Sequence, residues 1–387
     1  MDLEIIEADD GQWAEYDALT RRAYGQPVSD VVRLAPYADR RVVVRGGQVV
    51  AGGMGLLVPQ WVGGRPVPAA SMGCGCVAPE ERGGRLAGRL VEDRVRVLQD
   101  KGAVLATLWT AANGYVRRLG WEAPAQVFSW TVPTAALKRP DADTLDIAHG
   151  DTTQLAELRD RLSAQWNGPW QRPAWWTTWQ QDVHPTLETY AFSDHGRNPT
   201  GALAVAIERT PGGRQLVVQD FWAADAAAAN AMLAFLGRHH ARIPTVTFER
   251  TGLPPGLLLP SRLAGVGALT ATSWHPWMLR VLDLTRAVQL RGWPKEADFD
   301  LPMAVVTEDG RAAARYSLCV SGGEGELKTT GREPQLTINR GQFAVWYAGG
   351  YRSAAAALQA GVQGDPQALT RLLGVTAERE PWLADHF

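Results

Sequence analysis

The sequence predicts a mixed α/β chain of three domains, in which the second repeats the first in degenerate form and the third has its own α+β order. Three observations predict it. The chain has 387 residues, whereas one domain usually takes roughly 100–200. A pattern of antiparallel meander, helix and buried strand occurs twice. A linker marked by Pro and Asp at 138–143 separates the two copies. We expect domains at 1–137, 138–283 and 284–387.

The first domain opens with a strand at 3–6 and a helix at 13–24, where apolar residues keep helical spacing. Runs of β-branched residues joined by Gly-Gly turns then predict an antiparallel meander that ends at Val77. The meander is followed by a helix with one apolar stripe, a continuous apolar run typical of a buried strand, and a short helix, at 84–101, 103–109 and 113–119.

The second and third domains are predicted from the same kinds of signal. The second shows a helix, a hairpin across a Pro-Gly-Gly turn, an Ala-rich helix and a strand, at 152–166, 201–222, 223–241 and 246–249. In the third domain, helices are expected at 285–291, 340–348 and 365–373, and strands at 304–306, 314–320, 326–328 and 335–338.

Composition excludes several classes of protein. Hydrophobic residues make up 45% of a chain whose net charge is −2, so it is globular and has no field to attract nucleic acid or an anionic membrane. The three cysteines cannot all pair with one another. The N-terminus has no signal-peptide pattern, and no apolar run approaches the ~18 residues of a membrane helix. We expect a cytoplasmic protein.

The segment that joins the meander to the helix at 84–101 is rich in small residues. A strand that enters such a turn at a helix N-terminus gathers backbone N–H donors and the positive end of the helix dipole, which suits a pyrophosphate. An ordinary Gly-rich turn is the alternative, because a lone loop of this kind is weakly specific. The loop lacks the Lys-Ser/Thr of a P-loop, and the meander before it is unlike a dinucleotide-binding βαβ unit.

The element order and this loop resemble the GNAT acetyltransferase fold, whose acetyl-CoA loop reads Arg/Gln-x-x-Gly-x-Gly/Ala. Arg82 matches the first position and Ala87 the last, while Arg85 stands where that family has glycine. Two GNAT-like domains, the second without the loop, followed by a domain that resembles a sterol carrier protein, are similar to the Eis (enhanced intracellular survival) family of N-acetyltransferases. Segments 77–79, 111–121 and 277–280 match that family, and the resemblance covers essentially the full chain.

The resemblance implies that acetyl-CoA is the co-substrate. By residue matching, the pantetheine would be held by backbone groups, the diphosphate by the loop, and the acyl arm by two alanines. The residues so implied are Gly75, Cys76 and Val77, then Arg82, Gly83, Gly84, Arg85, Leu86, Ala87 and Gly88, and finally Ala111 and Ala112. A side chain at Arg85 either crowds the diphosphate or pairs with it.

Tyr115 falls at the general-acid position of that family, where a phenol of pKa ~10 donates a proton to the departing thiolate. A packing role for its ring is the alternative. The resemblance implies that the C-terminal carboxylate, here of Phe387, acts as base. A free α-carboxyl has a pKa of only ~3.5, and His386 is the alternative base because imidazole titrates near neutrality.

The remaining reactive side chains give weaker signals. Cys74 and Cys76 occupy alternate positions of one strand without a nearby histidine, which favours small buried residues over a nucleophile or a metal site. No metal is predicted. Five tryptophans between Trp166 and Trp179 favour a core or a subunit interface over a ligand-stacking site.

These observations predict an acetyl-CoA-dependent N-acetyltransferase that acts on primary amines by direct attack, through a tetrahedral intermediate. The resemblance implies aminoglycoside-like polyamines or lysine side chains as acceptors, a substrate pocket containing Tyr24, Cys74 and His386, and a hexamer. His386 stands where that family has an acidic residue. The alternative is an apolar-ligand-binding protein that uses its third domain and keeps a vestigial acetyltransferase site. No nucleic acid or membrane is expected as a partner.

Overall fold

The computed structural model describes residues 3–25, 34–137, 145–150, 152–194, 198–211, 213–250, 252–256, 258–264, 269–311 and 313–387. They form two compact units. The first unit contains the chain up to Ala125, Pro276–Glu380 and the last two residues, and the second contains Gln126–His275 and Pro381–Asp385. The predicted linker at 138–143 lies outside the described residues. No helix of the described residues is long and apolar enough to cross a membrane.

The first sheet of the first unit has the strand order β1-β2-β3-β6-β7-β15. The predicted antiparallel meander is confirmed, because β3 pairs antiparallel with both β2 and β6. A separate hairpin interrupts the chain between β3 and β6. The bounds are β1 Leu3–Glu7, β2 Ala38–Arg45, β3 Gln48–Leu57, β4 Gln60–Val62, β5 Arg65–Val67, β6 Ala69–Val77, β7 Leu105–Trp109 and β15 Trp277–Val281.

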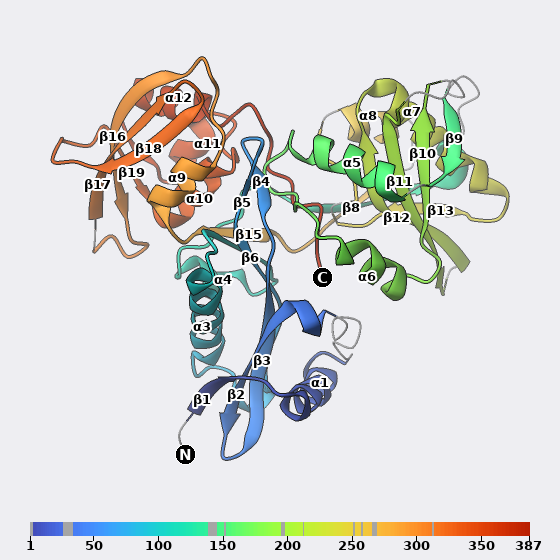
Figure 1. The fold of residues 1–387 in the computed structure, drawn as a ribbon, viewed down its shortest axis with the longest axis horizontal. Coiled ribbons are helices and arrows are strands. Elements are labelled where there is room, and N and C mark those ends of the chain that lie inside the picture. Colours follow the sequence, from blue (N-terminus) through green and yellow to red (C-terminus); the bar gives the residue numbers. More distant parts are fainter. Residues whose placement is uncertain are drawn as a thin grey trace. The chain divides into compact units, whose positions relative to one another are not determined.

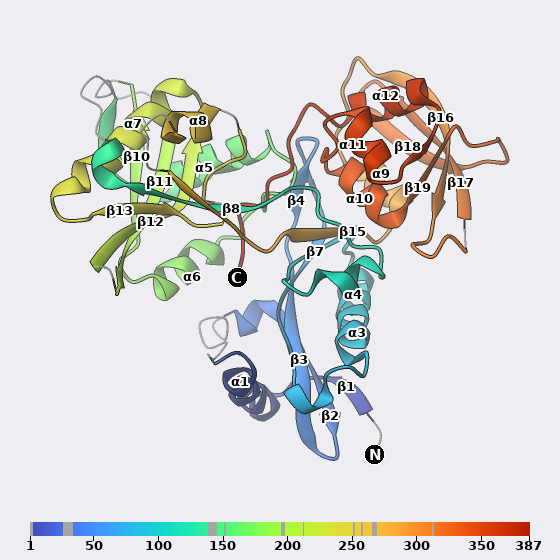
Figure 2. The ribbon, with the colours of Figure 1, turned by 180° about the vertical axis from the view of Figure 1, so that it is seen from behind.

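Two long helices cover opposite faces of this sheet (Figures 1 and 2). Helix α1 (Asp10–Tyr24) begins at a capping box in which Asp9 and Gln12 bond each other's backbone, and it ends at Gly25 in the left-handed conformation. Helix α3 (Leu86–Asp100) packs the predicted apolar stripe inward. A Cβ on Gly52 would meet α1, and a Cβ on the adjacent Gly53 would meet α3. Glycines at these two positions therefore let both helices approach the strand closely.

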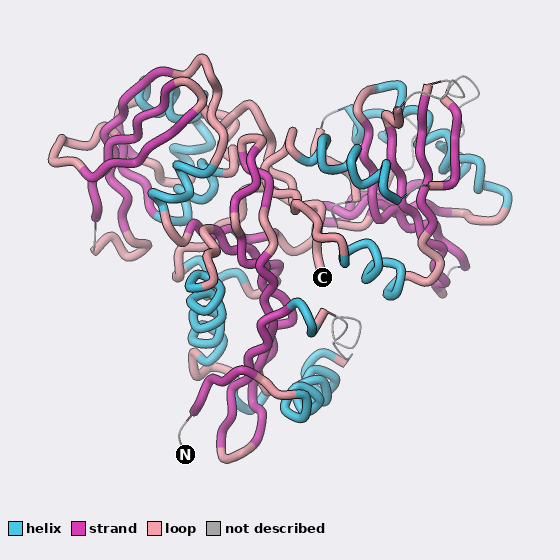
Figure 3. Tube along the Cα trace, in the orientation of Figure 1, coloured by secondary structure: helices cyan, strands magenta, loops and turns pink. Residues whose placement is uncertain are grey.

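The sheet of the second unit has the order β14-β8-β13-β12-β11-β10-β9, which repeats the first sheet with one further strand. The predicted hairpin is confirmed, with Glu208 opposite Gln215. Figure 3 shows helices alongside this sheet as well. The bounds are β8 Phe128–Pro133, β9 Asp146–His149, α5 Thr152–Ser163, α6 Trp175–Val183, β10 Glu188–Ser193, β11 Gly201–Thr210, β12 Gly213–Ala223, α7 Ala226–Gly237, β13 Thr245–Phe248, α8 Leu258–Ala264 and β14 Thr270–Ser273.

Two strands pair outside the domain in which their sequence position had placed them. β8, within the expected first domain, pairs antiparallel with β13 in the second sheet. β15, within the expected second domain, pairs antiparallel with β7 in the first sheet. Each strand covers an edge that would otherwise expose unpaired backbone groups. The boundaries at 137/138 and 283/284 stay predictions as divisions of the chain.

The third sheet, of order β18-β17-β16-β19-β20, belongs to the first unit. Its interior is filled by large side chains, because Phe343, Trp346 and Tyr347 of α10 are all fully buried. The Trp346 indole donates to the Leu372 carbonyl, and the Tyr347 hydroxyl donates to that of Ala287. The bounds are α9 Leu284–Leu290, β16 Asp298–Val306, β17 Ala313–Ser321, β18 Glu324–Thr329, β19 Leu336–Asn339, α10 Arg340–Tyr347, α11 Ala354–Gln359, β20 Gln363–Gly364 and α12 Pro366–Gly374.

Candidate active site

A β-bulge interrupts β6 where the sequence predicts a regular strand. The pairing of β3 with β6 shifts between Gly52, opposite Cys76, and Met54, opposite Gly73, so β6 carries one extra residue. Cys74 takes a left-handed backbone with φ of 51°. Cys74 and Cys76 both lie in β6, and the bulge separates them, because the extra residue lies between the two pairs.

Three consecutive carbonyls of the bulge each accept a hydrogen bond from a side chain. Nη2 of Arg94, on α3, donates to the Gly73 oxygen at 2.7 Å. The hydroxyl of Tyr16, on α1, shares its proton between the oxygens of Cys74 and Gly52, and the Tyr24 hydroxyl donates to Gly75. Because their carbonyls are satisfied by α1 and α3, these peptides are fixed from both faces of the sheet.

Arg94 is a functional candidate that the sequence reasoning missed. Its side chain is buried, its Nε has no partner among the described residues, and a Cβ on Gly53 would lie 2.5 Å from its Nη1. Burial lowers the pKa of the guanidinium. Arg94 occupies an apolar position of the α3 stripe, four residues from both Leu90 and Leu98. An arginine at such a position was the signal that could have found it.

The loop after β6 leaves the N-terminus of α3 free of a side-chain cap. Arg85 stands at the N-cap with a left-handed backbone of φ 60°, and no capping hydrogen bond comes from its side chain. Gly83 also has a positive φ, of 87°, and a Cβ there would meet nothing within 4 Å. The first backbone N–H groups of α3 therefore have no partner within the helix and are free of a side-chain cap, so they are available to an anion.

The loop, the bulge and α4 (Asn113–Arg117) line one cavity of about 1110 Å³. That exceeds the ~300–1,000 Å³ of most small-molecule pockets and suits a long cofactor. The predicted residues that line it are Tyr24, Gly75, Val77, Arg82, Gly83, Arg85, Leu86, Ala87, Gly88, Ala112 and Tyr115. The lining also includes residues that were not predicted, namely Ala23, Glu81, Thr110, Arg118 and Leu119. Arg118 and Leu119 follow α4 directly, so their proximity to Tyr115 was the available signal.

Six other predicted residues are not part of this lining, namely Cys74, Cys76, Gly84, Ala111, His386 and Phe387. Cys76 is buried in β6, while Gly84 and Ala111 are exposed beside lining residues. Burial raises the pKa of Cys74 to about 12 and also raises that of Cys76, so both thiols stay protonated at neutral pH and are weak nucleophiles. The described residues contain no group of three or more His, Cys, Asp or Glu side chains placed to hold a metal ion.

The position of Tyr115 is compatible with both of the roles that its sequence left open. It lines the cavity, and its ring also packs against the core that includes Val91, Val95 and Trp121. Burial raises the pKa of the phenol, while the positive charge of Arg94 lowers it. The phenol is therefore protonated at neutral pH and can donate a hydrogen bond into the cavity.

The last two residues of the chain pack against the first unit. The Phe387 ring lies so close to Gly73 that a Cβ there would clash with it. The His386 ring lies 6.4 Å, between centroids, from the ring of Trp109 at the end of β7. Both residues are thus held near the bulge, so a frayed tail is excluded for the described structure.

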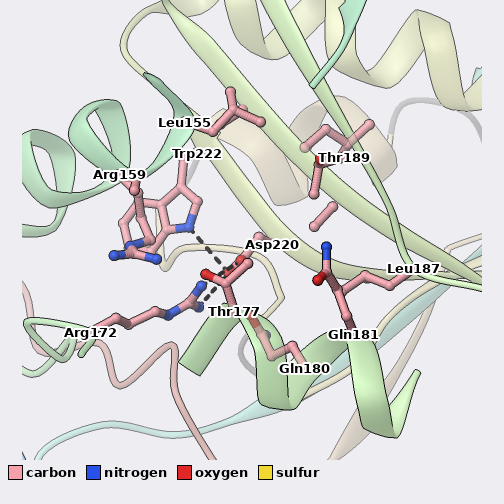
Figure 4. A pocket seen from close by; sticks show the side chains of 14 residues that line it. Leu155, Arg159, Arg172, Thr177, Gln180, Gln181, Leu187, Thr189, Asp220 and Trp222 are labelled. Carbon is pink, nitrogen blue, oxygen red and sulfur yellow. Dashed lines mark hydrogen bonds and ion pairs between the residues drawn. The ribbon is translucent and has the colours of Figure 1, made fainter. Parts of the chain in front are cut away.

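Within the second unit, a small cavity of about 50 Å³ lies between α5, α6 and the sheet (Figure 4). Arg172 lies between two carboxylates, with both terminal nitrogens 2.6 Å from Asp220 and Nε 2.5 Å from Asp385. Burial raises the pKa of Asp220, but the charge of Arg172 outweighs it and holds that pKa below its usual value. The tryptophan cluster forms part of this core, since Trp170 and Trp176 are fully buried.

Family models match three parts of the chain. Acetyltransferase (GNAT) domain models match residues 4–123 and 168–281, and a sterol carrier protein domain model matches 284–384. An uncharacterized N-acetyltransferase of Streptomyces avermitilis is 27% identical over 361 residues, which cover 84% of this chain and 82% of that protein.

Solved structures share the whole fold. A GCN5-related N-acetyltransferase from Kribbella flavida is 25% identical with a TM-score of 0.81, and one from Anabaena variabilis is 22% identical with a TM-score of 0.85. Eis1 from Mycobacterium abscessus is 17% identical with a TM-score of 0.77. Each comparison covers 100% of both chains. The predicted resemblance to Eis is thus supported by a shared fold.

The fold and the domain matches together define a tandem GNAT protein with a sterol-carrier-like third domain, as predicted. The chain is an N-acetyltransferase, and acetyl-CoA is its co-substrate. The uncapped α3 N-terminus and the long cavity fit that co-substrate. When bound, acetyl-CoA supplies the activated acetyl group.

Proposed function

We propose that this N-acetyltransferase acetylates primary amines, of the aminoglycoside-like polyamine or lysine side-chain class, and that it belongs to the Eis family. The amine attacks the thioester carbonyl directly, through a tetrahedral intermediate. The observation that carries the proposal is one cavity of the first unit, of about 1110 Å³, which is lined both by the uncapped N-terminus of α3 and by the phenol of Tyr115. A helix N-terminus can bind the diphosphate of acetyl-CoA, and a phenol can protonate the thiolate that leaves when the acetyl group is transferred.

We assign the roles of the site residues by residue matching to the Eis family. The backbone of Gly75, Cys76 and Val77 faces the pantetheine, and the loop from Arg82 to Gly88 holds the diphosphate. Ala111 and Ala112 flank the acyl arm. Tyr115 is the general acid that protonates the departing thiolate. Tyr24 lines the cavity beside the bulge. By residue matching to the Eis family, we assign Cys74 and His386 with it to the acceptor side.

The acceptor class is tested by measuring thiol release from acetyl-CoA in the presence of spermidine, an aminoglycoside and a lysine-containing peptide. An attacking amine must be neutral, so turnover should rise with pH in the range where the acceptor loses its proton. We expect amine-dependent thiol release with an N-acetylated product in mass spectrometry. Release at the same rate without any amine would contradict the proposal.

We assign the base to the α-carboxylate of Phe387, whose ring lies against Gly73 beside the bulge. A carboxylate in this place must relay the proton of the amine through a hydrogen bond or a water. Appending one or two residues moves it by about 3.3–3.6 Å per residue, so the extended chain should lose activity while keeping the wild-type melting temperature. The control is His386→Ala: if it abolishes activity while the extended chain stays active, the imidazole is the base.

The other predictions from the sequence have weaker support. Membership of the Eis family implies a hexamer, which light scattering of the purified chain would test. The alternative function, binding of an apolar ligand in the third domain, needs space inside that domain. In the described residues the interior beside α10 is occupied by fully buried aromatic side chains, so no observation favours the alternative.

A further inference from the structure

Two arginines line the cavity of about 1110 Å³, here called the main cavity, without pairing to another described residue. Arg85 and Arg118 both line the cavity, and in the part of the chain that the structure describes neither side chain makes a hydrogen bond or an ion pair. The other charged side chains of this lining are engaged. Arg82 donates from Nε to the Val77 carbonyl at 3.3 Å, and Glu81 pairs with Arg45 at 3.0 Å.

The backbone of Arg85 gives an independent reason to look for a ligand. Its φ of 60° is left-handed, a conformation that glycine adopts freely and that costs other residues about 1–2 kcal/mol. The two residues before it, Gly83 and Gly84, are glycines, whereas the left-handed position itself holds an arginine. A strained non-glycine residue at a cavity wall indicates that its side chain is used there.

The charge of acetyl-CoA exceeds what the α3 N-terminus can hold. The diphosphate would be held by the backbone N–H groups of the loop, where the helix contributes roughly half a positive charge. The 3′-phosphate is a phosphomonoester, and such a group carries about −1.5 to −2 at pH 7. A guanidinium presents a planar fork that bonds a phosphate in bidentate fashion. The two guanidinium groups that line this cavity therefore match the charge of that group, and each can bond a phosphate through two N–H groups.

Arg118 lines two adjoining cavities of the first unit. The second, of about 670 Å³, is also lined by Leu119, Arg280, Glu308, Asp309 and Arg340. There Arg280 pairs with Glu92 at 2.5 Å, and Asp309 pairs with Arg311 at 3.6 Å. We place the phosphate on the side of Arg118 that faces the larger cavity, because Arg85 lines that cavity and is absent from the lining of the smaller one.

We propose that Arg85 and Arg118 form a phosphomonoester subsite that binds the 3′-phosphate of acetyl-CoA and makes the enzyme discriminate against donors that lack it. The subsite rests on the placement of acetyl-CoA in the main cavity. The subsite also gives a function to Arg85, which stands where the GNAT family has glycine: its side chain provides a positive charge for the cofactor.

The test is calorimetric titration of the full chain with acetyl-CoA and with acetyl-3′-dephospho-CoA. The wild-type chain should bind acetyl-CoA at least about 10-fold more tightly, as charge-assisted hydrogen bonds predict. Arg118→Met and Arg85→Gly should each lose most of this preference, measured within each variant as the ratio of its dissociation constants for the two donors. Arg85→Gly keeps the left-handed backbone, so it removes the charge without disturbing the loop.

Arg89→Met is the matched control, because Arg89 is an exposed arginine of α3 outside the cavity lining. It should keep the full preference for acetyl-CoA. Equal affinity of the wild-type chain for the two donors would overturn the subsite and leave the proposed function intact. An equal loss of preference in Arg89→Met would also overturn the subsite, because the loss of any positive charge near the N-terminus of α3 would then explain the effect. Failure of the wild-type chain to bind either donor would instead contradict the placement of acetyl-CoA.

Discussion

Single side chains fix the backbone of this site, and Tyr16 is the one whose removal is most informative. Its hydroxyl serves the carbonyls of Gly52 and Cys74 inside the protein, and burial raises its pKa well above the usual value, so it stays a donor. Tyr16→Phe leaves buried acceptors unpaired and should lower the free energy of unfolding by about 1–3 kcal/mol. Urea denaturation measures this. The control is Tyr316→Phe, because the Tyr316 hydroxyl, on β17, makes no hydrogen bond to another described residue. Wild-type stability of Tyr16→Phe would contradict the role of Tyr16 in fixing the bulge.

The sequence predicted Tyr16 only as a member of an apolar helix stripe. Its hydrogen-bond partners are 36 and 58 residues away, and they come into reach only because β6 carries an extra residue. No local pattern reports such a bulge when the residue with positive φ is Cys74 rather than glycine. The loop residues were predictable because a Gly-rich turn before a strong helix is a local signal, as the lining by Gly83 and Gly88 illustrates.

At the scale of elements, two equivalent helices differ at their N-termini. α3 begins without a side-chain cap, whereas α7 begins at Asp225, whose carboxylate accepts from the Ala228 N–H at 2.8 Å. A carboxylate that occupies the first N–H groups excludes a diphosphate by competition and by charge. We therefore expect one acetyl-CoA per chain in calorimetric titration. Two equivalent sites per chain would contradict this difference between the helices.

The elements themselves were largely predictable, while their pairing was not. The helix at 84–101 and the meander before it follow from periodicity and turn residues, and both are confirmed. The exchange of β8 and β15 between the two sheets was not foreseen. Either strand satisfies the same backbone groups at a sheet edge, and sequence pattern gives no preference between the two edges.

At the scale of the whole molecule, the stability of the second unit depends on the buried group formed by Asp220, Arg172 and Asp385. Because the folded pKa of Asp220 lies below its unfolded value, its contribution is complete above about pH 4 and is lost as pH falls through the folded pKa. Asp220→Asn should destabilise the protein by about 3–5 kcal/mol at pH 7. Denaturation at several pH values should show this difference shrinking toward acid. A difference independent of pH would contradict the ion pair.

The central claim is that acetyl transfer occurs in the main cavity of the first unit with Tyr115 as the proton donor. The most direct measurement compares Tyr115→Phe with the wild-type chain in both acetyl-CoA affinity and steady-state transfer to an amine. The substitution removes one donor and almost no volume, so we expect unchanged affinity and a fall in kcat of about 10²–10⁴-fold. Wild-type turnover in Tyr115→Phe would contradict the claim and leave Tyr115 with its packing role alone.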